Sequence, residues 1–399
     1  LFGYSDEDMQ KMLIPMIRSG KEPIGSMGDT ARYAIFSDQP RSFFDYFYQR
    51  FAQVTNPPVD YIRERSVTNL KTTLGRRPNI FAPKNLIPPP PAIEFKSPAL
   101  SLAQMEYVCT YKDAERGYGG ICATEFDMTF KRDESAVGFR SRLNQVAGEV
   151  VAAVAKGTTI IILSDRNADF DNPPIPSLLM LRTVVNALNN AGTRLNAAIL
   201  VHSAEVRNTH HLAALIGFGA ACVCPYLALE IARYENAPEL EKLSADEKEQ
   251  NLLKAFETGL LKIMAKMGIS VLRSYQSAKL FTTIGLGQEL ISDFFPGLNS
   301  VIGGVEISDV AEDVLRRVEA AEQLSDKTKV FKTYQFKDYI IEKTGDYSVI
   351  SFNKCLQSAK PGQALLPYSS VKLLLSPGTT AKDVKITYHD KTEIPGEYK

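Results

Sequence analysis

The hydrophobic pattern in the middle of the chain alternates between short apolar runs and segments of helix length. Each run is rich in β-branched and apolar residues, which is typical of strands buried on both faces of a parallel sheet. The expected strands are residues 121–126, 159–165, 197–203, 221–226 and 269–275. Helix-length segments such as 175–191 and 204–216 lie between them. Strands and helices in regular succession predict a parallel α/β fold, either a barrel or a doubly wound sheet.

Residues 252–267 show the clearest helical pattern. A single apolar stripe at spacings of three and four is formed by Leu252, Phe256, Leu260, Ile263, Met264 and Met267. Gly268 follows at the position where a left-handed residue often ends a helix. We expect the charged run 241–254 ahead of the stripe to be a solvated face or a connector.

The two ends of the chain have different patterns. Residues 1–75 predict mostly helix, with Ser5 as an N-cap and Asp8 three residues later. A proline-rich connector follows, and residues after 326 are polar with short alternating runs. We therefore divide the chain into a helical N-terminal region with its connector (1–98), a β/α region (99–325) and a small β-rich extension (326–399). Because the chain opens just before a helix cap, without Met or a signal-peptide pattern, we expect it to be part of a longer polypeptide.

Residues 43–48 carry five aromatic side chains in six positions, which is too apolar for a solvated helix. They must pack against another element or another domain. One interpretation makes them the docking patch of a non-enzymatic interaction module.

Composition excludes several classes of function. Apolar residues make up 44% and charged residues 23%, which is ordinary for a globular protein. The 46 basic and 46 acidic residues cancel, so no bulk field attracts nucleic acid or an anionic membrane. No apolar run is long enough to span a bilayer. Five scattered cysteines favour a reducing compartment, so we expect a cytoplasmic protein without nucleic-acid or membrane partners.

Polar residues follow two of the predicted strands. Asp165 and Arg166 end one of them and His202 ends the next, at the edge where barrel enzymes carry their catalytic groups. Asp165 and Arg166 can bind a small anion, or they can satisfy the turn into the following proline-rich loop. Both interpretations stay open at this stage.

The histidines and cysteines do not form a metal motif. His210 and His211 are adjacent on a predicted helix, about 100° apart, so both cannot face one ion. Cys222 and Cys224 share a strand face, but a closed zinc site needs a second pair. We therefore expect no metal site and interpret these two thiols as buried structural groups.

Two glycine motifs are weak signals for a nucleotide or a flavin. Residues 217–220 follow a helix and precede a strand, which is the reverse of a dinucleotide-binding turn. Gly303 and Gly304 resemble a phosphate-binding turn of flavin barrels, but no Lys or Arg flanks them directly. We expect no bound cofactor and no catalytic residue in this chain.

The segment Val54-Thr55-Asn56-Pro57-Pro58 combines a hydroxyl, an amide and two rigid prolines. Such a segment can line a path for a small polar molecule. It can equally start the next helix, with Asn56 or Asp60 as the N-cap.

Specific motifs run in order through the first 325 residues. They are Glu22-Pro23-Ile24-Gly25-Ser26-Met27-Gly28-Asp29 and residues 51–58, 161–166, 175–179, 210–220, 225–228, 264–270, 274–275, 284–286 and 302–304. This ordered series resembles the central domain of the glutamate synthase large subunit. The resemblance implies an incomplete (β/α) TIM-like barrel, preceded by a helical, proline-linked region and followed by a small extension.

In that family the large subunit makes glutamate from glutamine and 2-oxoglutarate. The resemblance implies a chain that connects a glutamine amidotransferase domain to an FMN-binding synthase domain of the same polypeptide. It also implies that Thr55 and Asn56 line the ammonia tunnel between those domains. FMN and an iron–sulfur cluster are then expected in neighbouring domains and not in this one. An electron-donating small subunit or ferredoxin is a further expected partner.

The chain also departs from the family's catalytic parts. Leu1 stands where an amidotransferase has its nucleophilic Cys, and the cysteines lack iron–sulfur cluster spacing. We therefore expect the isolated chain to be inactive. The alternative is an independent flavin-dependent β/α-barrel oxidoreductase that uses Asp165, Arg166 and His202.

Overall fold

The structure is a computed structural model, and it divides the chain into two compact units, residues 1–25 with 42–332 and residues 26–41 with 333–399. It describes residues 1–5, 7–24, 33–37, 39–50, 63–79, 81, 89–112 and 120–325, and short strands within 339–394. Within these ranges no helix is both long and apolar enough to cross a membrane. The predicted domain boundaries at residues 98 and 325 stay a prediction.

The first unit contains all the long helices. Its helices are α1 (Ile14–Ser19), α2 (Glu64–Val67), α3 (Leu102–Cys109), α4 (Ser135–Ala155), α5 (Ser177–Asn190), α6 (Thr209–Gly217), α7 (Tyr226–Tyr234), α8 (Ala245–Met267), α9 (Leu272–Tyr275), α10 (Gln288–Phe294) and α11 (Ile307–Ser325). Its strands are β1 (Phe47–Gln49), β2 (Thr72–Gly75), β3 (Ala92–Phe95), β4 (Ala123–Asp127), β5 (Ile160–Ser164), β6 (Ala198–His202), β7 (Cys222–Cys224) and β8 (Phe281–Thr283). A π-helical turn, Asp8–Leu13, precedes α1, and a 3-10 turn, Phe43–Tyr46, precedes β1.

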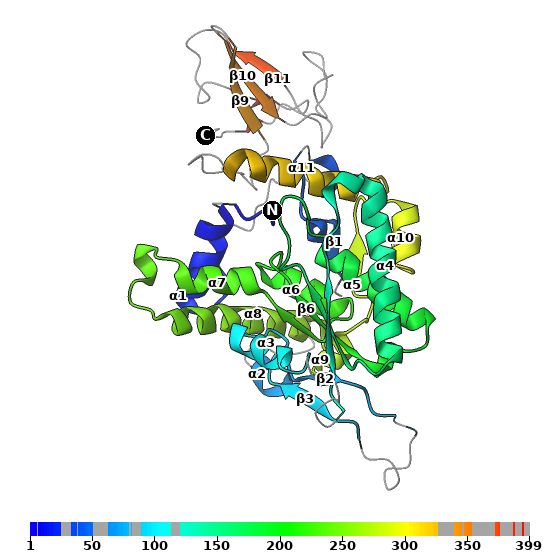
Figure 1. The fold of residues 1–399 in the computed structure, drawn as a ribbon. Coiled ribbons are helices and arrows are strands. Elements are labelled where there is room, and N and C mark those ends of the chain that lie inside the picture. The colour runs from blue at the N-terminus through cyan, green and yellow to red at the C-terminus, as the bar shows by residue number, and fades with distance from the viewer. Residues whose placement is uncertain are drawn as a thin grey trace. The chain divides into compact units, whose positions relative to one another are not determined.

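A parallel sheet in the order β4-β5-β6-β7 forms the centre of this unit (Figure 1). Helices α4, α5 and α6 connect successive strands, so the predicted α/β class is confirmed. The four predicted strands between residues 121 and 226 are confirmed with shorter bounds. The backbone of Pro98 and Leu100 hydrogen-bonds to Val223, so this segment continues the sheet beyond β7.

The strands are apolar because both faces of the sheet are covered. Residues Ile160 to Leu163 of β5 are fully buried, as are Ile199 to Val201 of β6. Helix α5 packs against β5, and α4 packs against both β4 and α5. Burial on both faces explains why these strands read as continuous apolar runs instead of alternating ones.

Helix α8 is longer than the apolar stripe predicted. It begins after Ser244, whose side chain forms a capping box, and ends at Gly268 with φ 70°, the left-handed cap that was expected. The charged run is therefore part of the helix. Most of its charged residues are exposed, so the expected solvated face is confirmed, whereas the alternative of a connector is wrong from Ala245 on. Lys248 and Glu249 are buried exceptions, and Glu249 pairs with Arg233 at 2.6 Å.

The predicted strand at residues 269–275 is wrong. Val271 forms an isolated parallel bridge with Asn69, and α9 follows directly. Leu272 and Tyr275 are both buried while the residues between them are exposed. Buried residues three positions apart are typical of a helix. The apolar residues of this segment are equally compatible with a strand, so the pattern alone does not distinguish the two.

The aromatic residues 43–48 belong to the core. Phe43, Phe44, Tyr46 and Phe47 are buried, and the Phe47 ring lies 5.3 Å from Phe218 and 5.0 Å from Phe295. Strand β1 pairs antiparallel with β8. These residues pack against other elements as predicted, so the interpretation of a docking patch is wrong. The N-terminal region is accordingly less helical than predicted, because it also contributes β1 and β2.

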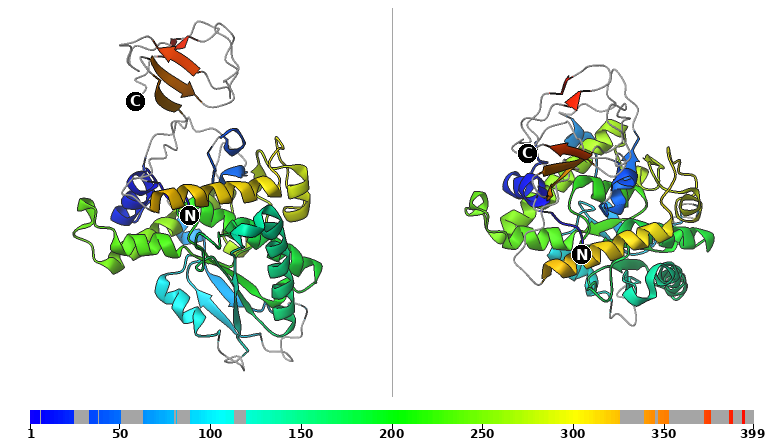
Figure 2. Two further views of the ribbon diagram at one scale, coloured as in Figure 1. Left: turned by 45° about the horizontal axis from the view of Figure 1, so that its top comes forward. Right: turned by 90° about the horizontal axis from the view of Figure 1, so that it is seen from above.

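The second unit consists of short strands, among them β9 (Tyr339–Thr344), β10 (Tyr347–Phe352) and β11 (Lys372–Leu375). These three form an antiparallel sheet in the order β11-β10-β9, and β12 (Ile386–Thr387) pairs with β13 (Glu393–Ile394) (Figure 2). A 3-10 turn, Ala34–Phe36, also belongs to this unit. The described elements after residue 338 are therefore all strands.

Candidate functional site

The carboxyl ends of β5, β6 and β7 bring the three predicted rim residues together. Ser164 lies opposite His202, and His202 lies opposite Cys224, in the parallel register. The residues that follow these positions therefore share one edge of the sheet. Asp165 and Arg166 follow β5, and Tyr226 begins α7 just after β7.

Asp165 is buried and fully engaged by the chain. Its carboxylate accepts hydrogen bonds from the Ser203 hydroxyl, from the Ala204 N–H at 3.0 Å and from the Tyr226 hydroxyl. Burial raises the pKa of Asp165 to about 7, although these donors oppose the rise. Glu205 nearby adds to it. The carboxyl group thus ties the ends of three neighbouring strands together.

His202 is also buried, and its ring contacts different partners. Its Nδ1 lies 3.2 Å from the Ser164 hydroxyl oxygen, and its ring centre lies 4.7 Å from that of Tyr226. Burial lowers the pKa of His202 to about 4, and the neighbouring Glu125 offsets only part of that effect. The imidazole is therefore neutral at pH 7, packed between a hydroxyl and an aromatic ring.

Arg166 points toward solvent, with 55% of its side chain exposed. Its guanidinium lies 5.2 Å from the centre of the Tyr226 ring and pairs with Glu230 at 3.3 Å. Tyr226 thus contacts all three rim candidates, yet the sequence analysis did not select it. The available signal is its place as the last residue of a predicted strand, at the same edge as Asp165 and His202.

The N-terminal residues cover this edge of the sheet. The Tyr4 hydroxyl donates to the carbonyl of Ala204 at 2.9 Å, and the Arg207 guanidinium lies 5.3 Å from the Tyr4 ring centre. Arg207 also donates to the carbonyl of Phe2 and pairs with Asp8 at 3.4 Å. Figures 1 and 2 show the N-terminus beside α11. The N-terminal residues therefore contact the segment that follows β6 at this edge.

The predicted N-cap near this cover is confirmed by its hydrogen bonds. The Asp8 N–H donates to the Ser5 hydroxyl at 3.0 Å, and the Asp8 carboxylate accepts from the N–H of Ser5 at 3.0 Å. This reciprocal pair is a capping box with Asp in place of Glu or Gln. It fixes the direction in which the N-terminal residues leave the first helical turn.

The two adjacent histidines face different partners, as the sequence predicted. His210 Nε2 lies 3.1 Å from the carbonyl oxygen of Phe44, while His211 Nδ1 lies 3.1 Å from that of Glu205. The His211 ring also stacks on Phe44 at 4.2 Å. Among the described residues, no group of three or more His, Cys, Asp or Glu side chains could hold a metal ion. Cys222 and Cys224 are free, buried thiols, as interpreted from the sequence.

The turn at Gly303 and Gly304 leads into Val305 and Glu306, which contact the start of α10. The N–H groups that open α10 already hydrogen-bond to the carboxylate of Glu306, with Leu290 N–H at 2.8 Å. The N–H of Gly285 donates to the carbonyl of Ile302. The Glu306 carboxylate thus accepts hydrogen bonds at the N-terminus of α10, and binding of a phosphate at Gly303 and Gly304 stays untested.

Thr55 and Asn56 lie outside the described residues. Their interpretation as tunnel-lining residues stays a prediction. Most of the motif at residues 21–29 lies outside them as well.

Comparison with known proteins gives a consistent result. The chain matches the glutamate synthase central domain family over residues 1–287. It is similar to ferredoxin-dependent glutamate synthase 2 of Synechocystis sp., with 37% identity over 333 residues, 79% of this chain and 20% of that protein. It is also similar to the glutamate synthase [NADPH] large chain of Bacillus subtilis, with 36% identity over 324 residues, 81% of this chain and 20% of that protein.

Among solved structures, a mutant flavocytochrome b2 with pyruvate bound matches over 47% of this chain and 40% of its own. The identity is 13% and the TM-score is 0.30, which is too low to support an argument about fold. The chain spans about a fifth of the length of the curated relatives that it matches.

Proposed function

Because this chain belongs to the glutamate synthase central domain family, we propose that it is the connecting domain of a glutamate synthase large subunit. It links a glutamine amidotransferase domain to an FMN-binding synthase domain and helps to wall the ammonia path between them. The complete enzyme makes glutamate from glutamine and 2-oxoglutarate. The observation that carries this proposal is the family match over residues 1–287.

The physical purpose of such a domain is containment. Ammonia released into water is diluted and protonated, whereas a closed route keeps its local concentration high at the second reaction site. Thr55 and Asn56 are proposed to line that route. A hydroxyl and an amide there can exchange hydrogen bonds with ammonia as it passes.

We propose that the domain itself carries no catalytic, cofactor-binding or metal-binding residue. Asp165 and His202 support this, because the Asp165 carboxyl group and the His202 Nδ1 atom are engaged by residues of neighbouring strands. Arg166 supports it as well, since it pairs with Glu230. In this proposal the three rim residues hold strand ends in place.

The fold is proposed to be an incomplete (β/α) barrel. Four parallel strands alternate with helices, and Ala99 pairs with Val223 of β7, at the far edge from β4. Since Ala99 precedes β4 in the chain, its return to the opposite edge favours a sheet that curls toward closure.

The remaining parts of the reaction are assigned to other domains. FMN and an iron–sulfur cluster belong to neighbouring domains, and the amidotransferase and FMN-binding domains of the same polypeptide are the partners. Electrons come from a small subunit or from ferredoxin. The two relatives differ in this respect by name, one being ferredoxin-dependent and the other an NADPH enzyme. The scattered cysteines favour a cytoplasmic location.

The test of the tunnel role is a Thr55→Trp substitution in the complete synthase polypeptide. Glutamate formed and glutamine hydrolysed are measured together with ammonia released into solution. We expect glutamine hydrolysis to continue while glutamate formation falls and free ammonia rises, because the indole would block the route. Thr110→Trp, at the exposed end of α3, is the matched control and should leave the ratio unchanged.

An unchanged ratio in Thr55→Trp would contradict the tunnel assignment. The 399-residue chain alone gives a second test. We expect a colourless protein without turnover on glutamine and 2-oxoglutarate. A yellow protein whose flavin absorbance survives gel filtration would instead favour the independent flavin-dependent oxidoreductase.

A further inference from the structure

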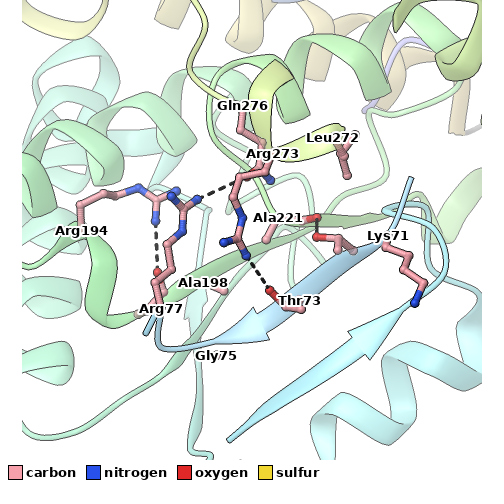
Figure 3. Close-up of a pocket in the computed structure, with 12 residues that line it drawn as sticks. Lys71, Thr73, Gly75, Arg77, Arg194, Ala198, Ala221, Leu272, Arg273 and Gln276 are labelled. Atoms are coloured by element: carbon pink, nitrogen blue, oxygen red, sulfur yellow. Dashed lines mark hydrogen bonds between the residues drawn. The ribbon is translucent and has the colours of Figure 1, made fainter. Parts of the chain in front are cut away.

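A recess lies at the amino end of the parallel sheet, opposite the rim (Figure 3). It is lined by β2, by Lys71 before it and Arg77 two residues after it, by the starts of β6 and β7, and by α9. Three of its lining residues are Arg77, Arg194 and Arg273, which come from three distant segments of the chain. We call it the basic recess.

Two of the arginines are half-buried and held in place by neutral groups. The Arg77 side chain donates to the amide oxygen of Gln276 at 3.3 Å. Arg194 donates to the carbonyl oxygens of Ala197 at 3.1 Å and Gly219 at 2.8 Å. The two guanidinium groups lie next to each other in Figure 3. A guanidinium has five N–H donors, so each keeps donors beyond these bonds.

The third arginine comes from the opposite wall. Arg273 is exposed and donates to the Thr73 hydroxyl at 3.3 Å, which directs its guanidinium toward β2. Lys71 also lines the basic recess, but its charge is matched by Glu94 at 2.8 Å. None of the ion pairs formed within the described residues joins a carboxylate to Arg77, Arg194 or Arg273.

The three positive charges act on one another. Burial lowers the pKa of Arg77, and repulsion from Arg273 lowers it further. Burial also lowers the pKa of Arg194 to about 10, with added repulsion from Arg77 and Arg182. Like charges so placed are relieved by an anion between them.

We propose that the basic recess binds a small phosphate-type oxyanion, either free phosphate or the phosphoryl group of a small metabolite. Guanidinium groups bind such oxygens through paired, charge-assisted hydrogen bonds. A dianion would offset most of the charge that the three arginines concentrate. Because two of the arginines are half-buried, the basic recess favours an occupant of few atoms over an extended acidic chain.

The proposal is tested by titrating inorganic phosphate into the 399-residue chain in a calorimeter, at low ionic strength with sodium chloride as the reference salt. We expect saturable binding of one phosphate per chain, which chloride does not reproduce. Glycerol 2-phosphate is titrated in parallel. If it binds as well as inorganic phosphate, the site accepts a phosphoryl group on a metabolite; if it does not bind, the ligand is free phosphate.

Two variants connect the binding to the basic recess. Arg273→Gln and Arg77→Gln should each weaken phosphate binding by about tenfold or more. Arg76→Gln removes the same charge from an exposed neighbour outside the lining and should leave the affinity unchanged. Arg194 is left intact because its carbonyl bonds hold the fold. Circular dichroism establishes that each variant is folded.

Absence of saturable phosphate binding by the unsubstituted chain would overturn the proposal. Equal weakening in Arg76→Gln and Arg273→Gln would overturn it too, because it would show a general effect of net charge. If one recess variant fails to fold, the other still decides between these outcomes.

Discussion

At the carboxyl end of the central sheet, buried charges are matched by groups of the chain itself, whereas at the amino end three arginines share a recess without a carboxylate. Asp8 pairs with Arg207, and Asp165 accepts hydrogen bonds from Ser203 and Tyr226. The carboxyl end is where barrel folds carry their catalytic groups, and here its buried charged groups lie beside counter-charges or hydrogen-bond donors of the chain. The two ends of the sheet therefore differ in whether the chain itself supplies the counter-charge.

The largest expected effect follows from breaking the buried ion pair at the carboxyl end. Asp8→Asn leaves the Arg207 guanidinium buried without its counter-charge, so we expect the free energy of unfolding to fall by about 3–5 kcal/mol. Urea denaturation of the 399-residue chain measures it. Glu230→Gln removes the half-exposed partner of Arg166 and should change the same quantity by less than about 1 kcal/mol. Equal losses would mean that the two pairs do not differ as described.

The second effect is a pH dependence centred on Asp165. Its pKa rises from 3.8 to about 7 on folding, so its contribution to stability is present below about pH 4 and is lost as the pH rises through 7. The unsubstituted chain should therefore lose stability between pH 4.5 and 7.5, whereas Asp165→Asn should not. The free energy of unfolding of the variant should rise relative to that of the unsubstituted chain over this range. The change should be on the order of 3 kcal/mol, measured by urea denaturation at both pH values.

His202→Gln is the control for that experiment because its effect has the opposite sign. The pKa of His202 falls from 6.5 to about 4 on folding, so its contribution is present above about pH 6.5 and is lost as the pH falls through 4. Relative to this variant, the unsubstituted chain should lose stability between pH 7.5 and 4.5. Parallel pH profiles for the two variants would contradict both assignments.

The smallest effect is expected at the basic recess. Arg273→Gln removes one of three like charges. At low salt its free energy of unfolding should therefore exceed that of the unsubstituted chain by a few tenths of a kcal/mol. That gain should disappear near 1 M salt, where screening acts over about 3 Å. Thermal unfolding in a phosphate-free buffer at both salt concentrations measures it. A gain that does not depend on salt would argue against repulsion within the recess.

Sequence alone located the carboxyl edge because its residues lie at strand ends. Continuous apolar runs mark β5 and β6, and the polar residues that follow these runs include Asp165 and His202. In a parallel sheet these ends meet at one edge, so the pair could be predicted without coordinates. What the pattern could not show is the cover. Tyr4 contacts Ala204, which lies 200 residues later in the sequence, and no local sequence pattern predicts such a contact.

The basic recess was missed for the same reason. Arg77 lies in a connector, Arg194 in a 3-10 turn before β6 and Arg273 on α9, and each alone resembles a surface arginine. The run at residues 269–275 was assigned to a strand because it is apolar, yet tertiary contacts bury Leu272 and Tyr275 in a helical turn. Local propensity is weak evidence for the secondary structure of a segment of only four residues. Here the packing of Leu272 and Tyr275 determines that the segment is helical.

The cover formed by the first residues also constrains the order of folding during synthesis. The Tyr4 hydroxyl hydrogen-bonds to the carbonyl of Ala204. The carbonyl of Phe2 accepts a hydrogen bond from the Arg207 guanidinium, which lies 205 residues later in the chain. At a translation rate of about 5–20 residues per second, these partners emerge about 10–40 s after the N-terminal segment. The capping box of Ser5 and Asp8 can form early because it is local. Residues 2 and 4 are therefore synthesised well before the residues that they contact, and they are among the last of this segment to reach their final contacts.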